Sequence, residues 1–469
     1  MPEAVIVDAV RSPIGRAFKG SLAQVRPDET AAYVVDQLLE RNPDVAPDSV
    51  EEVFCGCGMP QGLQAFNIAR IMVLLSERLP TEVNGVTFAR YCASSLDAIR
   101  HAGNAIRAGE GDTYIAAGVE WVSRYNERTE PAGADDRNEN LLGNDGQPNA
   151  YIDMGLTAVN VAKRYEVSRS DMDKYAQRSQ ELAVKSQEDG YFDREIVPVT
   201  LPDGTEVAKD DGPRPNSTLE KLAALDEAFE GGGGITAGNS CPLNDGAAAV
   251  LVMSEDRAKE LGLQPKAKII TAATHGNEPE YMGVAPIGAI KTVLERAGMK
   301  MDDVGAVELN EAFAAQVIPI MDECDIPLEK LNTHGGAIAL GHPFGMTGAR
   351  IVTAATAANE PEYMGVAPIG AIKTVLDRAG MKIDDVGTVE LNEAFAAQVI
   401  PIMDECDIPL EKLNTHGGAI ALGHPFGMTG ARIMGTLLNA METDDHAVGL
   451  ETMCVAGGQG EAMVVERLN

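Results

Sequence analysis

Short uninterrupted apolar runs alternate with segments of helical periodicity in the first part of the chain. Residues 4–10 and 113–118 are short and apolar, a pattern that predicts buried strands. Between them, residues 28–40 begin with acidic side chains and a threonine and continue with an apolar stripe, which predicts an amphipathic helix. Strands that alternate with helices predict an α/β domain.

The pattern changes after residue 120. Residues 127–149 and 202–217 are rich in loop-forming side chains, and residues 171–189 have the broken apolar stripe of a polar helix. An apolar run returns at residues 246–253 and predicts another core strand. The sequence therefore predicts an insertion between elements of a single α/β layer.

A nearly exact repeat occupies the last third of the chain. Residues 271–352 and 353–434 align at an offset of 82 and differ at six positions only. Each copy predicts a helix (286–297 or 368–379), a strand that ends in Glu-Leu-Asn-Glu-Ala-Phe-Ala, and a glycine-rich turn that contains Gly-His-Pro before a second helix. Two copies are too few for a solenoid, so we interpret the repeat as a tandem duplication inside one domain.

The charge balance narrows the choice of partners. The chain has 38 Lys and Arg against 71 Asp and Glu, a net charge of −33. This charge argues against nucleic acid or an anionic membrane as a partner, and an anionic ligand would need a local basic pocket. No apolar run is long enough for a membrane span, and the N-terminus lacks the features of a signal peptide. We therefore expect a cytoplasmic protein.

Seven cysteines in 469 residues are too few for a disulfide framework and are expected to be reduced thiols. The Cys55-Gly56-Cys57 spacing fits a buried strand end better than a metal site, and we expect no metal. Cys92 precedes a predicted helix whose first residues are Ser94 and Ser95. A helix N-terminus favours a thiolate, so Cys92 is either a nucleophile or a buried core cysteine.

Further candidate residues, two histidines, two asparagines and a cysteine, lie in motifs of the repeat copies and of the C-terminal segment. His342 and His424 lie in Gly-His-Pro, where an imidazole could accept a thiol proton or serve only in packing. Asn310 and Asn392 end predicted strands and could orient water or a carbonyl, or cap a turn. Cys454 begins Cys-Val-Ala-Gly-Gly, whose glycines allow a substrate close to the backbone.

In this order, these motifs resemble those of the thiolase family. The resemblance covers the whole chain apart from one repeat copy. It is carried by residues 10–16, the segment around Cys92, residues 154–158, 236–240 and 243–247, and the Asn-Glu-Ala-Phe, Gly-His-Pro and Cys-x-x-Gly-Gly motifs.

The resemblance implies a five-layered αβαβα fold from two similar halves with an inserted loop domain. The expected boundaries are 1–119 and 241–265 for the N-terminal half, 120–240 for the coenzyme A-binding loop domain, and 266–469 for the C-terminal half with copies 271–352 and 353–434.

The resemblance also implies a reaction, the thiolysis of 3-ketoacyl-CoA by coenzyme A or its reverse, acetoacetyl-CoA formation. Cys92 would attack the keto-thioester and carry the acyl group, the Gly-His-Pro histidine would take the thiol proton, and Cys454 would protonate the acetyl-CoA carbanion. One oxyanion hole would use that histidine and a water held by the asparagine, and the other would use backbone N–H groups near Cys92 and Ala456. Coenzyme A is expected as a substrate, without a permanently bound cofactor.

The resemblance also implies contacts with coenzyme A. By resemblance they fall on Arg214, Met154, Ser240 and Phe395. Two positions depart from the family pattern: Cys241 stands where a serine is frequent, and Asp153 stands where many members have histidine.

A single catalytic site needs one histidine and one asparagine, so only one of the two repeat copies can supply them. His424 lies 30 positions before Cys454, a spacing that resembles the family's. Use of the second copy would place the extra segment, 277–358, at a loop, whereas use of the first would interrupt a helix near Val352. Because loops tolerate insertions better, the sequence favours His424 and Asn392 over His342 and Asn310.

Two other functions compete with a thiolase. A ketoacyl synthase would resemble a Cys-His-His set, which Cys454 argues against. A non-catalytic acyl-CoA- or lipid-binding protein could result if the duplication distorted the site. The resemblance implies a homodimer or homotetramer.

Overall fold

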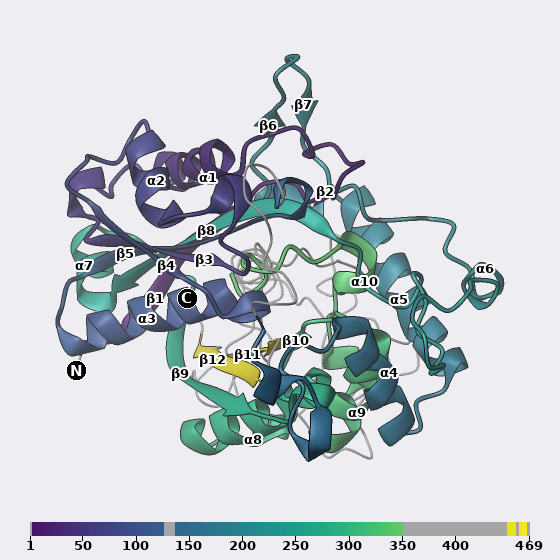
Figure 1. Cartoon of the computed structure of the whole chain (residues 1–469). Helices are drawn as coiled ribbons and strands as arrows, with labels where there is room; N and C mark the ends of the chain where they lie inside the picture. The colour runs from purple at the N-terminus through teal and green to yellow at the C-terminus, as the bar shows by residue number, and fades with distance from the viewer. Residues whose placement is uncertain (1, 126–136, 350–447, 456–458, 467–469) are drawn as a thin grey trace, which may run out of the picture.

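The computed structural model describes residues 2–125, 137–349, 448–455 and 459–466 (Figure 1). Its strands are β1 (Ala4–Arg11), β2 (Gly15–Arg16), β3 (Glu52–Cys57), β4 (Asn84–Phe88), β5 (Thr113–Trp121), β6 (Val199–Thr200), β7 (Glu206–Val207), β8 (Asn244–Ser254), β9 (Ala267–Gly276), β10 (Val307–Leu309), β11 (Val448–Val455) and β12 (Gln459–Glu466). Its α-helices are α1 (Pro27–Arg41), α2 (Ile68–Leu75), α3 (Ser94–Ala108), α4 (Met154–Arg164), α5 (Arg169–Glu188), α6 (Leu219–Ala223), α7 (Glu255–Glu260), α8 (Pro286–Ala297), α9 (Ala314–Glu323) and α10 (Ala337–Leu340).

Ten of these strands form one strongly curled sheet. Its order is β10-β11-β12-β9-β1-β8-β5-β3-β4, and β2 pairs with β8 off this path. The sheet is mixed, because β3 runs parallel to both β4 and β5 whereas β8 runs antiparallel to β1 and β5. The residues of β1, β5 and β8 are buried throughout, as expected for strands covered on both faces.

The curl divides the sheet into two parts with helices between and outside them (Figure 1). Helices α1 and α2 cover one outer face, α3 lies between the two parts of the sheet, and α8 covers the other outer face. This arrangement confirms the predicted α/β thiolase-type fold in five αβαβα layers.

The first repeat copy packs against the segment that precedes β8. Helix α9 contacts α4 and α5, and α10 contacts α5. Apolar residues of α4, α5, α8 and α9 share one buried cluster, which includes Val161, Ala176, Val293 and Val317. The burial of these side chains holds the Gly-His-Pro turn at the end of α10 beside the 120–240 segment.

Most predicted elements are confirmed within a few residues of their expected ends. The helix 286–297 coincides with α8, and the strand 246–253 lies within β8. Helix α9 is missing from the prediction because Pro319, inside it, is a residue that normally ends helices. The predicted loop 202–217 contains the two-residue strand β7, which pairs with β6 in a short local hairpin.

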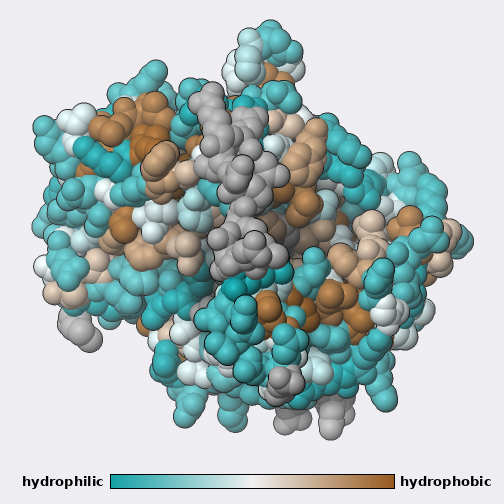
Figure 2. All heavy atoms as spheres, viewed as in Figure 1, coloured by the Kyte–Doolittle hydropathy of each residue, from teal (hydrophilic) through white to brown (hydrophobic). Residues whose placement is uncertain are grey.

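Polar residues cover most of the face shown in Figure 2, in keeping with the strongly acidic composition. Within the described ranges, none of the helices combines the length and the apolar character needed to cross a membrane.

Candidate functional site

Cys92 lies in a tight turn that leads into α3. The turn spans Tyr91–Ala93, and Tyr91 has a φ of 43°. The Ser94 hydroxyl accepts a hydrogen bond from the Arg90 backbone N–H at 2.9 Å and donates to the Tyr91 carbonyl at 2.6 Å. The structure therefore confirms the predicted place of Cys92 just before a helix. Its side chain is 2% exposed, so a substrate has to reach it through the site itself.

Strands β10 and β11 bring two further motifs to the same edge of the sheet. They are parallel, with Leu309 opposite Thr452, so their carboxyl ends meet at one edge. Asn310 follows β10 directly, and Cys454 lies near the end of β11, paired across the backbone with Gly460. Strand β11 also packs beside the Cys92 turn. Three motifs that are far apart in the sequence thus meet.

His342 is held at both ring nitrogens. The Asn310 side-chain nitrogen lies 3.0 Å from Nε2, and the Thr347 hydroxyl oxygen lies 2.8 Å from Nδ1. The Thr347 hydroxyl also donates to the Pro343 carbonyl at 3.1 Å, so it accepts from Nδ1–H. The amide of Asn310 donates to Nε2. This pattern assigns the proton to Nδ1; the Nε2 lone pair accepts from Asn310, so a thiol proton has to take the place of that hydrogen bond.

Complete burial keeps His342 neutral. The side chain is buried, and desolvation lowers its pKa well below the ordinary value, because the imidazolium would lose its hydration. A neutral imidazole is the form that can accept a proton from a thiol.

The backbone conformation just before His342 is fixed by Gly341 and by Asn244, which is distant in the sequence. Gly341 has a φ of 112°, and a Cβ at this position would lie 1.9 Å from the Asn244 side-chain oxygen. That oxygen accepts a hydrogen bond from the His342 backbone N–H at 2.9 Å. Only glycine satisfies both the positive φ and the close approach, and Asn244 thereby fixes the start of the Gly-His-Pro turn.

The proposed coenzyme residues come from separate segments, and Ser240 pairs with Phe313 of the Asn-Glu-Ala-Phe motif. Arg214 lines a pocket of about 300 Å³ together with residues of α5, and burial lowers its pKa. Ser240 is buried and donates to the Thr236 carbonyl at 2.7 Å, so its hydroxyl is engaged in the fold. Met154 is the first residue of α4, whose N-cap is Asp153. These positions leave the coenzyme contacts as predictions.

The structure describes the first repeat copy at the site. Asn392, Phe395 and His424 lie outside the described residues, so the preference for the second copy also stays a prediction. Phe313, the counterpart of Phe395, is buried and lies edge-on to Phe229 with ring centres 6.2 Å apart.

Sequence reasoning missed the residues that hold the histidine. Asn244 belongs to residues 243–247, which only marked the family resemblance, and Thr347 carried no assignment. Glu120, which contacts the loop after His342, lies next to the last residue of a largely apolar strand. A charged residue inside a buried apolar run is a signal that could have identified it.

Comparison with protein families agrees with this geometry. The family model described as thiolase, N-terminal domain, matches residues 4–256. The model described as thiolase, C-terminal domain, matches twice, over residues 263–358 and 351–467. The model matches twice because each of its matches covers one copy of the internal repeat.

Individual relatives cover most of the chain. A 3-oxoadipyl-CoA/3-oxo-5,6-dehydrosuberyl-CoA thiolase of Escherichia coli K12 is 42% identical over 373 residues, which are 76% of this chain and 92% of the relative. A 3-ketoacyl-CoA thiolase of Bacillus subtilis 168 is 42% identical over 364 residues, 75% of this chain and 91% of the relative.

Solved structures of two proteins superpose over nearly the whole length. The acetyl-CoA acetyltransferase of Bacillus anthracis has a TM-score of 0.74 at 31% identity, covering 100% of this chain and 99% of its own. The dimeric peroxisomal thiolase of Saccharomyces cerevisiae has a TM-score of 0.75 at 30% identity, covering 99% and 98%. On these matches and on the site geometry, the chain belongs to the thiolase family.

Proposed function

We propose that the protein is a thiolase, an acyltransferase that cleaves 3-ketoacyl-CoA with coenzyme A to acyl-CoA and acetyl-CoA, and that can run in reverse to form acetoacetyl-CoA. The observation that carries this proposal is the hydrogen bond between Asn310 and the Nε2 atom of a neutral, buried His342, at an edge of the sheet where Cys454 and the Cys92 turn also meet.

In the first half-reaction, the Cys92 thiol passes its proton to Nε2 of the histidine, and the thiolate attacks the keto carbonyl. The bond between the α and β carbons breaks, the acyl group stays on Cys92, and the α-carbon of acetyl-CoA takes a proton from Cys454. In the second, coenzyme A passes its thiol proton to the Cys454 thiolate and attacks the acyl-cysteine; the bond to Cys92 breaks, acyl-CoA leaves, and the Cys92 thiolate takes back the proton from the histidine. Donors near each oxyanion stabilise the developing charge.

The proposal takes the histidine and asparagine from the described geometry, His342 and Asn310. His424 and Asn392 are the alternative that the sequence argument prefers. Their surroundings in sequence are identical, so the chemistry is the same whichever copy serves the site.

Binding of the substrate is proposed to use the 120–240 segment. Arg214 supplies positive charge for the phosphates of coenzyme A in a chain that is otherwise strongly acidic. Met154, Ser240 and a phenylalanine of the Asn-Glu-Ala-Phe motif complete the proposed contacts. We further propose a cytoplasmic homodimer or homotetramer.

The test is thiolysis of acetoacetyl-CoA and of a longer 3-ketoacyl-CoA by the full-length chain, with Cys92→Ser as the inactive control. Turnover that Cys92→Ser abolishes is the expected result. Binding of acyl-CoA without turnover would favour the binding-only alternative. Cys454→Ala should abolish hydrogen exchange at the acetyl α-carbon, and retention of that exchange would point away from a thiolase.

A further inference from the structure

Glu120 is a buried carboxyl group that the proposed mechanism does not use. It lies near the end of β5, is 0% exposed, and stands among the apolar residues of that strand. Burial raises its pKa to about 7. A carboxylate in such a place destabilises the fold unless its hydrogen bonds compensate for the lost hydration.

The hydrogen bonds of Glu120 join two parts of the site. One oxygen accepts from the backbone N–H groups of Gly58 at 2.8 Å and Gly345 at 2.6 Å. The other accepts from the Met59 backbone N–H at 3.2 Å and from the Gln64 side-chain amide. Gly58 and Met59 follow β3, whereas Gly345 follows the Gly-His-Pro turn. The carboxylate therefore connects the end of β3 to the histidine loop.

The contact between these two segments is as close as backbone allows. A Cβ on Gly345 would lie 2.3 Å from the Gly58 nitrogen and 2.5 Å from the Cys57 Cα. A Cβ on Gly58 would lie 2.6 Å from Phe344. Backbone atoms fill the space at Gly345, and the Glu120 carboxylate and the Phe344 Cβ fill the space at Gly58, so a side chain on either glycine has to separate the segments.

Aromatic side chains connect the loop after His342 to the surroundings of both His342 and Cys92. The Phe344 ring lies edge-on to His342, with centres 5.7 Å apart, and stacks on Tyr125 at 6.3 Å. The Tyr125 hydroxyl lies against Glu120 and within electrostatic reach of Cys92. The same loop packs on the Cys92 helix, because the Ala349 backbone N–H donates to the Ser95 hydroxyl at 3.0 Å. The position of the loop thus sets the position of the histidine.

We propose that Glu120 is a positioning residue for the thiolase reaction: its ionised carboxylate holds the loop that follows His342 against the end of β3, and thereby holds the imidazole in place for proton transfer with Cys92. The inference rests on the proposed function and adds to it a residue that acts through His342.

The ionised form is required because four N–H donors and the Cys57 thiol converge on two oxygens. A protonated carboxyl or an amide turns one oxygen position into a donor, which would face other donors. The titratable groups that face Glu120 are Cys55, Cys57 and Tyr125, and burial raises the pKa of each. They are neutral near pH 7, so they do not replace the negative charge.

The sign of the pH effect follows from the raised pKa. The folded protein takes up a proton at Glu120 as the pH falls through about 7, whereas an unfolded carboxyl stays ionised there. Protonation relieves the buried charge, so the fold is not weakened, but the loop loses an acceptor. We expect an acid limb in kcat near this pH without loss of folded protein.

Glu120→Gln is the direct test in the full chain, with acetoacetyl-CoA as substrate. At about pH 8 we expect kcat to fall about 10-fold or more and KM to stay within about 2-fold, because the imidazole is misplaced and not removed. The acid limb of the wild-type kcat profile should disappear. A variant with wild-type kcat and an unchanged acid limb would overturn the proposal.

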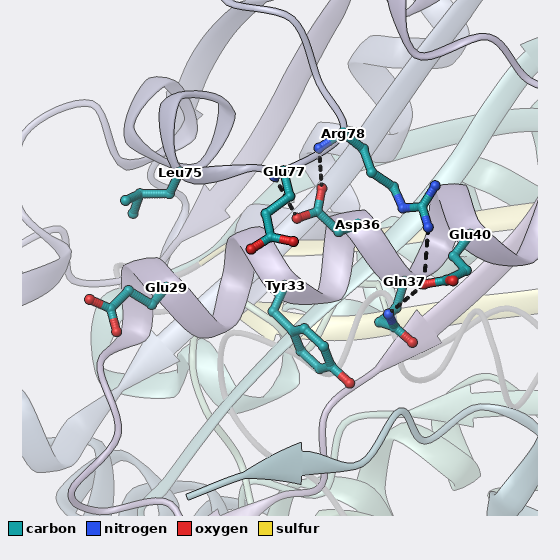
Figure 3. A pocket seen from close by; sticks show the side chains of 8 residues that line it. All are labelled: Glu29, Tyr33, Asp36, Gln37, Glu40, Leu75, Glu77 and Arg78. Atoms are coloured by element: carbon teal, nitrogen blue, oxygen red, sulfur yellow. Dashed lines mark hydrogen bonds and ion pairs between the residues drawn. The ribbon is translucent and has the colours of Figure 1, made fainter. Parts of the chain in front are cut away.

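Asp36→Asn is the matched control. Asp36 is also a buried carboxylate that gathers backbone N–H groups, from Glu77 at 2.9 Å and Arg78 at 3.3 Å. Figure 3 shows it in an acidic surface pocket where Arg78 also pairs with Glu40. None of these residues belongs to the proposed site. Asp36→Asn should lower stability while leaving kcat and its pH profile unchanged.

The repeat provides a second, independent test if Glu120→Gln fails to fold. Gly345→Ala places a methyl group against the β3 backbone, and Gly427→Ala makes the identical change in the other copy. We expect kcat to fall about 10-fold for Gly345→Ala only. Full activity of Gly345→Ala would contradict the proposal.

Failure of the proposed function has a separate signature, because the wild-type chain would then not turn over. In that case, the rate at which iodoacetamide alkylates Cys92, followed by peptide mass spectrometry, replaces kcat. Glu120→Gln should slow this reaction relative to wild type and Asp36→Asn, because proton removal by the imidazole is impaired. Equal rates in all three proteins would overturn the positioning role by itself.

Discussion

The two reacting sides of the site are held in different ways. The Cys92 turn is fixed by neighbours in sequence: Ser94 bonds to Arg90 and Tyr91, and Arg90 pairs with Asp97 at 2.9 Å. His342 contacts Thr347 and the Phe344 ring nearby in the sequence, but it is also held by Asn310, 32 positions away, and by Asn244, 98 positions away. The placement of the nucleophile is thus encoded locally, and that of the base depends on the assembled fold.

The largest effect should separate the two repeat copies. His342→Ala removes the base of the described site, and we expect kcat to fall about 1,000-fold, within the range of general base catalysis. His424→Ala should leave kcat within about 2-fold of wild type. Both are measured as thiolysis of acetoacetyl-CoA by the full chain. The opposite result would show that the second copy serves the site, as the sequence argument prefers.

A smaller loss is expected when a distant partner of the histidine is removed. Asn244→Ala deletes the acceptor of the His342 backbone N–H and a 3.0 Å bond to the Gly15 carbonyl. We expect kcat to fall about 10- to 100-fold, because the imidazole moves without being lost. The measurement is kcat and KM for thiolysis.

Asn42→Ala serves as the control for this prediction. Asn42 is also buried and bonds to the Leu38 carbonyl at 2.8 Å, but it lies at the end of α1. Asn42→Ala should lower the stability of the fold and leave kcat unchanged. Equal losses of kcat in both variants would mean that Asn244 acts through general stability.

This difference explains what the sequence could predict. The end of β3 at Cys57, the start of α3 after Cys92 and both bounds of α8 follow local patterns, and each was predicted close to its observed place. The catalytic residue types were identified from their motifs. The roles of Asn244, Thr347 and Glu120 could not be predicted, because they depend on contacts across the sheet that no local pattern records.

The extra repeat copy should affect stability more than chemistry. One copy is redundant for a single site, and each carries apolar segments, such as Val-Ile-Pro-Ile-Met, that normally pack in a core. Left without a core, such segments promote association or swapping. A chain without residues 277–358 should therefore melt at a higher temperature than the full chain. An equal or lower melting temperature, measured by calorimetry, would contradict this.

The smallest effect should come from the locally held side. Ser94→Ala removes the two hydrogen bonds that shape the Cys92 turn, and we expect the free energy of unfolding to fall by about 1 kcal/mol. The half-buried Ser49, which donates to the Ala46 carbonyl at 2.6 Å, gives the control Ser49→Ala, with a smaller loss. Urea unfolding measures both. Because Arg90, Asp97 and the helix itself still hold the turn, kcat of Ser94→Ala should fall less than that of Asn244→Ala. A larger loss in Ser94→Ala would mean that the nucleophile, too, depends on a single contact, and the contrast between the two sides would fail.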